Sequence, residues 1–191
     1  MPLFFDNDHP NPKTTQEYTS LSYPQTTSAY ISRIPVFKAK YGKGLSGEQR
    51  IQSDQEIDDF FRNYVQIGID TLERFDDYLI RYIEQGNTAE LMIRGFASPL
   101  ASTSYNEALT KRRISSILNH FKTCHHGKLA SFIQDGRLKI TQAPHGETLA
   151  SEGVSDSAAD KRNSIYSPAA SRERRVEIIE IKVEGTEKLG K

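Results

Sequence analysis

Apolar residues recur at helical spacing through the middle of the chain, and this is the strongest pattern in the sequence. The stripe is spaced by threes and fours and consists of Ile57, Phe61, Tyr64, Gly68, Leu72, Phe75, Leu79 and Tyr82. It predicts one amphipathic helix of about 30 residues. Ser53 followed by Glu56 is a capping-box pattern that predicts the start of this helix, and Gly86 predicts its end.

Short apolar or alternating segments on either side of this helix predict strands. The predicted strands are residues 3–5, 91–93, 138–141 and 176–183. The alternation of the last strand changes phase at Ile178-Ile179, which predicts a β-bulge.

Two further helices are expected, one over 36–41 and one from the capping pair Ser104 and Glu107 to about Phe121. The Ser-, Asp- and Gly-rich segment 146–164 is expected to be a loop. The polar segment 9–30 is compatible with a surface loop or with an ordered arm held by its tyrosines. The resulting order of elements predicts an α/β (α+β) sandwich with helices on one face of a mixed sheet.

Composition limits the classes of function. Lys plus Arg and Asp plus Glu both number 25, and this balance argues against a general nucleic-acid binder, which normally has a basic excess. No apolar run is long enough to span a bilayer as a helix. The single cysteine, Cys124, excludes an internal disulfide. Because apolar residues begin at position 3, we expect the chain to be one domain of a longer precursor.

The densest polar constellation lies on the second capped helix. Asn106, Leu109 and Arg113 are spaced i, i+3 and i+7, so they share one helix face. The last strand is entered through the charged run 172–175, which contains three arginines. If these arginines converge with Arg113, they form a cradle for a carboxylate, because a guanidinium group matches a carboxylate bidentately. The alternative is that they are solvated surface charges.

Several segments together resemble an OmpA-like C-terminal domain, in the form found in Bacteroidota. The segments are Ile93-Arg94-Gly95-Phe96-Ala97-Ser98, Tyr105-Asn106-Glu107-Ala108-Leu109-Thr110-Lys111-Arg112-Arg113, Ser171-Arg172-Glu173-Arg174-Arg175-Val176-Glu177-Ile178, Phe4-Phe5-Asp6-Asn7-Asp8 and His145-Gly146-Glu147. The resemblance implies a single domain over 1–191 with a β-α-β-α-β-β mixed sheet, and it identifies 9–50 as a variable insertion.

The family binds peptidoglycan without covalent chemistry. The resemblance therefore implies a non-enzymatic module at the periplasmic face of the outer membrane, which tethers an outer-membrane protein or lipoprotein to the cell wall. The implied ligand is the stem peptide, chiefly meso-diaminopimelate, and neither a metal nor a cofactor is implied. The positions that match the family's ligand-binding residues are Asp8, Ser98, Asn106, Leu109, Arg113, Arg174 and Arg175.

Ser98 is the main departure from the family pattern, which has an aspartate there to pair with the ammonium of the ligand. The sequence leaves three alternatives. The ligand differs, or an acid from the group Asp6, Asp8 and Glu173 replaces the aspartate, or the domain has lost peptidoglycan binding and serves as a protein-interaction module of the envelope.

Other candidate motifs are weaker. Cys124-His125-His126 is expected to be a solvated helix end, because adjacent ligands rarely converge on one ion and no second Cys/His cluster follows. His145-Gly146-Glu147 is expected to be a turn rather than an acid/base pair. Gly42-Lys43-Gly44 lacks the spacing of a phosphate-binding loop. No constellation in the sequence supports an enzyme.

Overall fold

A mixed four-stranded sheet forms the centre of the protein. The computed structural model describes residues 1–97, 100–144, 154–155, 157 and 159–184. The strands are β1 (Pro2–Phe4), β2 (Thr88–Gly95), β3 (Leu138–Pro144) and β4 (Arg175–Glu184). Their order across the sheet is β1-β4-β2-β3. β2 is parallel to β3, and β4 is antiparallel to both β1 and β2. The fold is therefore mixed α/β.

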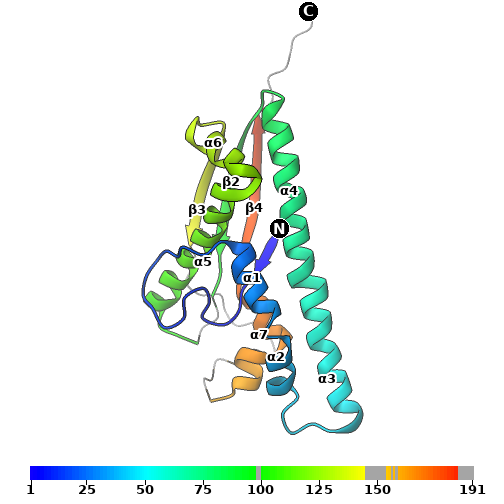
Figure 1. The fold of residues 1–191 in the computed structure, drawn as a ribbon. Helices are drawn as coiled ribbons and strands as arrows, with labels where there is room; N and C mark the ends of the chain where they lie inside the picture. Colours follow the sequence, from blue (N-terminus) through cyan, green and yellow to red (C-terminus); the bar gives the residue numbers. More distant parts are fainter. Residues whose placement is uncertain (98–99, 145–153, 156, 158, 185–191) are drawn as a thin grey trace, which may run out of the picture.

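Helices make up most of the remaining described chain (Figure 1). The α-helices are α1 (Tyr23–Ile31), α2 (Ile34–Tyr41), α3 (Gly47–Phe60), α4 (Ile67–Glu84), α5 (Thr103–Thr123), α6 (Lys128–Gln134) and α7 (Pro168–Glu173). π-Helical segments span Phe61–Gln66 and Arg162–Tyr166, and a 3-10 turn spans Cys124–Gly127. Within the described residues, none of the helices has the length and apolar character needed to cross a membrane.

The predicted long helix is present but starts earlier than expected. α3, the π-helical segment and α4 follow one another directly and extend along one side of the molecule (Figure 1). The first residue is Gly47, preceded by the N-cap Ser46, so the predicted start at Ser53 is wrong and Ser53 is buried inside the helix. The first turns of α3 are polar and therefore carry no apolar stripe. Gly86, with φ of +94°, follows the end of the helix as predicted.

The main core lies between one face of the sheet and helices α4, α5 and α6. Along β2, Ala89, Leu91, Ile93 and Gly95 are buried and alternate with less buried residues, as in a strand with one covered face. The pairing of β2 with β4 shifts register between Met92 and Ile93, and Ile179 is skipped. This irregularity confirms the bulge predicted at Ile178-Ile179.

A second apolar cluster joins residues 9–50 to the long helix. Its buried members are Phe4, Tyr30, Phe37, Ile57, Phe60, Phe61 and Val65. The rings pack mainly edge to face, for example Tyr30 on Phe61 with centroids 4.8 Å apart. The segment that the sequence identified as an insertion thus contributes buried side chains through α1 and α2, and the predicted short helix over 36–41 is part of α2.

α5 also begins slightly earlier than its predicted capping pair. Ser102 is the N-cap, and its hydroxyl accepts a hydrogen bond from the backbone N–H of Tyr105. This cap places Asn106 in the first turn of the helix. The start of α5 lies against the segment that follows β1, where the candidate site is found.

Candidate functional site: a cavity with a buried arginine

A cavity of about 270 Å³ lies where the chain leaves β1 and enters α5. Its lining comes from four stretches of chain and comprises Asn7, Asp8, Leu100, Ala101, Tyr105, Asn106, Leu109, Arg113, Lys161 and Ile165. Four of the positions singled out in the sequence are among them: Asp8, Asn106, Leu109 and Arg113. The structure therefore brings together residues about 100 positions apart in the chain.

α5 presents three of these residues on one face. Asn106, Leu109 and Arg113 are all buried, and all three line the cavity, as their spacing predicts. The side-chain amide of Asn106 donates to the carbonyl oxygen of Ala101 at 3.1 Å, which ties the helix to the preceding loop. Asn106 and Arg113 thus supply polar groups, while Leu109 supplies an apolar surface between them.

Arg113 is fully buried and is held by main-chain oxygens. Its Nε donates to the carbonyl of His9 at 3.1 Å, and its Nη1 donates to the carbonyl of Phe96 at 2.8 Å. Nη2 donates to the carbonyl of Asp6 at 3.3 Å. Among the described residues, no carboxylate forms a direct ion pair with Arg113, although the charges of Asp8 and Asp6 lie near enough to favour its protonated form. Three neutral carbonyls thus fix the guanidinium group.

The electrostatic surroundings favour an anion beside Arg113. Burial, together with the nearby charges of Arg174 and Arg112, lowers the pKa of Arg113 to about 9. The group is still protonated at neutral pH, but its charged form is disfavoured by its environment. A carboxylate entering the cavity would relieve that cost, because an opposite charge stabilises the protonated form.

Asp8 contributes the acidic group on the same cavity. Its Oδ1 accepts a hydrogen bond from the Tyr105 hydroxyl at 2.5 Å, and its Oδ2 accepts one from the backbone N–H of Lys13 at 2.9 Å. Nη2 of Arg112 lies 3.8 Å from Oδ1. Burial and the bond to Asp8 raise the pKa of Tyr105, so this hydroxyl remains a donor to the carboxylate. A quarter of the Asp8 side chain is exposed, which leaves it accessible from the cavity mouth.

Asp6 and Glu173, the other two acids considered as replacements for the family aspartate, are engaged elsewhere. Asp6 forms an ion pair with Arg33 and accepts a hydrogen bond from the backbone of Asn7. Glu173 is buried, and its carboxylate lies 3.9 Å from Arg175. Of the three acids, Asp8 is the one that lines the cavity.

Arg174 and Arg175 do not join Arg113 on the described cavity lining. The three arginines therefore do not meet on the lining of this cavity, although the charge of Arg174 lies near enough to Arg113 to lower the pKa of Arg113. Arg174 is buried at the end of this helix and donates to the carbonyls of Ala170 and Ile165, each at 2.9 Å. Since Ile165 lines the cavity, Arg174 holds one of its walls in place rather than facing a ligand.

Arg175 packs on a different group. Its guanidinium lies over the ring of Phe96, 4.5 Å from the centroid, and its Nε donates to Glu177 at 2.6 Å. Ser98 and the segment His145-Gly146-Glu147, which the sequence also singled out, lie outside the described residues.

Three lining residues with polar side chains were not among the predicted site residues: Asn7, Tyr105 and Lys161. Asn7 and Tyr105 adjoin the predicted residues Asp8 and Asn106, so their positions in the matched segments were a usable signal. Lys161 lies within the segment 146–164 that was expected to be a loop, and no pattern in the sequence connects it to α5.

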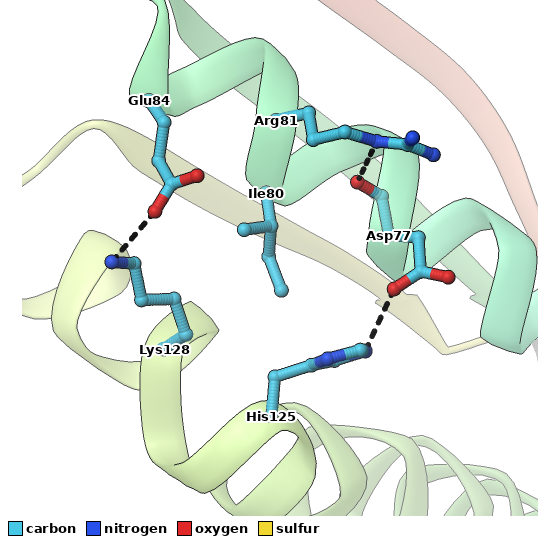
Figure 2. A pocket seen from close by; sticks show the side chains of 6 residues that line it. All are labelled: Asp77, Ile80, Arg81, Glu84, His125 and Lys128. Carbon is cyan, nitrogen blue, oxygen red and sulfur yellow. Dashed lines mark hydrogen bonds and ion pairs between the residues drawn. The ribbon is translucent and has the colours of Figure 1, made fainter.

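A larger surface depression of about 400 Å³ lies between α4 and the start of α6 (Figure 2). Two side-chain pairs cross it, whereas Arg81 donates to the main-chain carbonyl of Asp77 on its own helix, as Figure 2 shows. Nζ of Lys128 lies 2.7 Å from Glu84, and Nε2 of His125 lies 3.5 Å from Asp77. Because these side chains pair with each other across the depression, it has fewer charged groups available to bind a ligand than the cavity beside Arg113.

The fold and the cavity define a mixed α/β domain with a small cavity beside the segment that follows the edge strand β1, lined by apolar surface and a few charged or polar side chains. Comparison with models of known protein families gives no match, and neither the curated proteins nor the solved structures include one.

Proposed function

We propose that this chain is an OmpA-like domain that binds the stem peptide of peptidoglycan non-covalently. The order of the strands and the main helices supports the proposal: a strand, helices, a second strand, helices and a third strand follow one another, and short helical segments precede the final strand. The mixed sheet with one covered face supports it as well.

The observation that carries the proposal is the buried guanidinium of Arg113 in the wall of the cavity, whose direct hydrogen-bond partners are main-chain carbonyls and not a carboxylate. Three of the five N–H groups of Arg113 donate to carbonyls, which fixes the orientation of the guanidinium group. The other two N–H groups remain for a ligand. A stem-peptide carboxylate is the anion that completes this arrangement. Lys161 adds a second positive charge at the same cavity.

Asp8 takes the ammonium group of the ligand in this proposal. The cavity combines two cations, Arg113 and Lys161, with one carboxylate, and meso-diaminopimelate combines carboxylates with an ammonium in the same way. Asp8 thus fills the role that the family gives to the aspartate matched here by Ser98. Asn106 and Leu109 orient the peptide and pack against its aliphatic part.

The biological role that follows is a tether and not an enzyme. The domain sits at the periplasmic face of the outer membrane and connects a parent membrane protein or lipoprotein to the cell wall. Many weak attachments in parallel suffice for such a role, because linked binding sites multiply avidity.

Calorimetric titration with the tripeptide L-Ala-γ-D-Glu-meso-diaminopimelate tests the proposal. We expect saturable binding by the unaltered chain, and a loss of about 10- to 100-fold in affinity for Asp8→Asn, since a charge-assisted hydrogen bond contributes about 1.5–3 kcal/mol. Asp135→Asn is the matched control, because it removes the same charge at the end of α6, outside the cavity lining. Circular dichroism verifies that each variant is folded.

Absence of binding by the unaltered chain contradicts the proposal. If binding then appears in Ser98→Asp, the domain has kept the fold and lost the wall ligand, which is the protein-interaction alternative. Equal losses of peptide affinity in Asp8→Asn and Asp135→Asn would show that the peptide binds outside this cavity.

A further inference from the structure

Three metal-ligating side chains meet between α4 and the end of α5. They are Asp76, His120 and Cys124, and their ligand atoms all lie within 4.8 Å of one another. Asp76 occupies a buried position on the apolar stripe of α4, and only 1% of it is exposed. His120 and Cys124 are separated by one helical turn, so both project toward the same side of α5.

The carboxylate of Asp76 is only half satisfied. Its Oδ2 lies 2.6 Å from Nε2 of His120, but its Oδ1 is buried with no hydrogen-bond partner among the described residues. A buried carboxylate oxygen without a partner is costly, and such oxygens in native proteins usually find a donor or a cation. The same carboxylate supplies an oxygen to the cluster that contains the imidazole and the thiol.

We propose that Asp76, His120 and Cys124 form a binding site for a divalent transition-metal ion, with Zn²⁺ as the preferred ion. A set of one oxygen, one nitrogen and one sulfur ligand matches the borderline softness of Zn²⁺ and disfavours Mg²⁺ and Ca²⁺, which take oxygen ligands. Water completes the four-coordinate sphere. Cys124 is only partly buried, so an ion can enter from its side.

Charge balance supports this site. Binding replaces the S–H bond of Cys124 with a metal–sulfur bond, and the proton leaves to solvent. The resulting thiolate and the Asp76 carboxylate together neutralise the two charges of the ion, so no net charge is left in a largely buried place. His120 coordinates as the neutral imidazole through Nε2, with its proton on Nδ1.

The site differs from the triplet seen in the sequence. His125 and His126 have positive φ values of 47° and 56° and are exposed, and His125 pairs with Asp77. The sequence pattern that corresponds to this site is the i, i+4 pair of His120 and Cys124. The third ligand, Asp76, comes from α4 and is distant in the sequence. The metal would thus tie α4 to the end of α5, and this inference is independent of peptidoglycan binding.

Cobalt titration of the full chain after chelator treatment tests the site. We expect one Co²⁺ per chain, a near-ultraviolet thiolate-to-cobalt charge-transfer band and the visible bands of tetrahedral Co²⁺. Zn²⁺ should displace Co²⁺ and abolish these bands. The affinity for Zn²⁺, measured by competition with a chromophoric chelator, should fall in His120→Gln and in Cys124→Ser by more than the roughly 10- to 100-fold that loss of a supporting partner costs.

His126→Gln is the matched control, because His126 lies two residues from Cys124 and outside the cluster. It should keep the cobalt spectrum and the Zn²⁺ affinity unchanged. The proposal is overturned if the unaltered chain shows no thiolate band, if the band persists in His120→Gln, or if His126→Gln abolishes it. Circular dichroism of the metal-free variants separates loss of a ligand from loss of the fold.

Discussion

Arg112 and Arg113 are consecutive in α5 and both are completely buried, and their guanidinium groups donate to different main-chain carbonyls. Arg113 lines the cavity and is fixed by the carbonyls of Asp6, His9 and Phe96, which follow β1 and β2. Arg112 is bonded to the polar segment that follows β1. One helix thus uses two neighbouring cations for two purposes, one to present a charge and one to hold an irregular segment in place.

The first prediction concerns Arg112. Its Nε donates to the carbonyl of Pro10 at 2.6 Å, and its Nη1 donates to those of Thr14 and Gln16 at 3.0 and 2.6 Å. Replacing it with Met leaves these carbonyls without their donor, so we expect Arg112→Met to lower the free energy of unfolding by about 3 kcal/mol or more. Urea denaturation measures this loss.

Arg74→Met is the control for this prediction, because Arg74 is exposed on α4 and donates only to Asp70 on its own helix. Its effect should stay within about 0.5 kcal/mol. If the two variants are equally stable, the polar segment does not depend on Arg112.

The second prediction concerns the salt dependence of wall binding. Lys161 is exposed at the cavity, so its attraction to an acidic peptide is screened by salt, whereas the buried charge of Arg113 is screened less. Sedimentation with purified sacculi should therefore show weaker binding at high salt for the unaltered chain. Lys161→Met should bind more weakly at low salt and vary less with salt.

Lys122→Met serves as the comparison, since Lys122 is exposed in the last turn of α5, outside the cavity lining. It removes the same charge and should leave both the affinity and the salt dependence unchanged. Identical behaviour of the two lysine variants would mean that net charge, and not the cavity, controls wall binding.

The third prediction concerns the contact between β2 and α5. A methyl group added at Gly95 would lie 2.3 Å from Cγ2 of Thr110, a fully buried side chain. Gly95→Ala should therefore destabilise the protein by about 1–3 kcal/mol through overpacking. The double variant Gly95→Ala/Thr110→Ser removes the clashing methyl group and keeps the hydroxyl that donates to Asn106.

Thermal and urea unfolding of the unaltered chain, Gly95→Ala, Thr110→Ser and the double variant together form a complete double-mutant cycle. We expect the double variant to recover most of the stability lost in Gly95→Ala. If the losses simply add, the strand and the helix do not touch at this point.

Local patterns predicted much of the fold because the elements that pack on the sheet are regular. The stripe through Leu72 and Leu79 indicated α4, and the change of phase at Ile178-Ile179 located the bulge. The start of α3 was not predictable in the same way, because its first turns are polar and Ser53 with Glu56 imitates a cap. α1 was missed because the polar residues around Tyr23 and Tyr30 hide its buried face.

The candidate site was only partly predictable for a related reason. Asn106, Leu109 and Arg113 belong to one helix, so their spacing alone places them on one face. The position of Arg174 depends on α7, which turns the chain just before β4, and no periodicity indicates that turn. Asp76 is a charged residue on an apolar stripe, and the sequence gives no reason for it because its partner His120 lies 44 residues later in the chain.

The fourth prediction concerns alkaline pH. Tyr23 is completely buried, and its hydroxyl donates to the carbonyl of Phe4 at 3.5 Å. Burial raises the pKa of Tyr23 well above its ordinary value of 10. The unfolded chain therefore loses this proton first as pH rises through 10, while the folded chain keeps it. The stability that the neutral phenol provides is complete below pH 10 and is lost above it.

The free energy of unfolding should thus fall above pH 10, with a contribution from Tyr23 of at most about 1.4 kcal/mol per pH unit. Tyr23→Phe removes this contribution, so its stability should fall less steeply with pH. Some slope will persist, because burial also raises the pKa of Tyr30. Tyr18→Phe is the control, since Tyr18 is 67% exposed, and it should follow the unaltered chain. Parallel curves for Tyr23→Phe and the unaltered chain would show that Tyr23 is accessible to solvent.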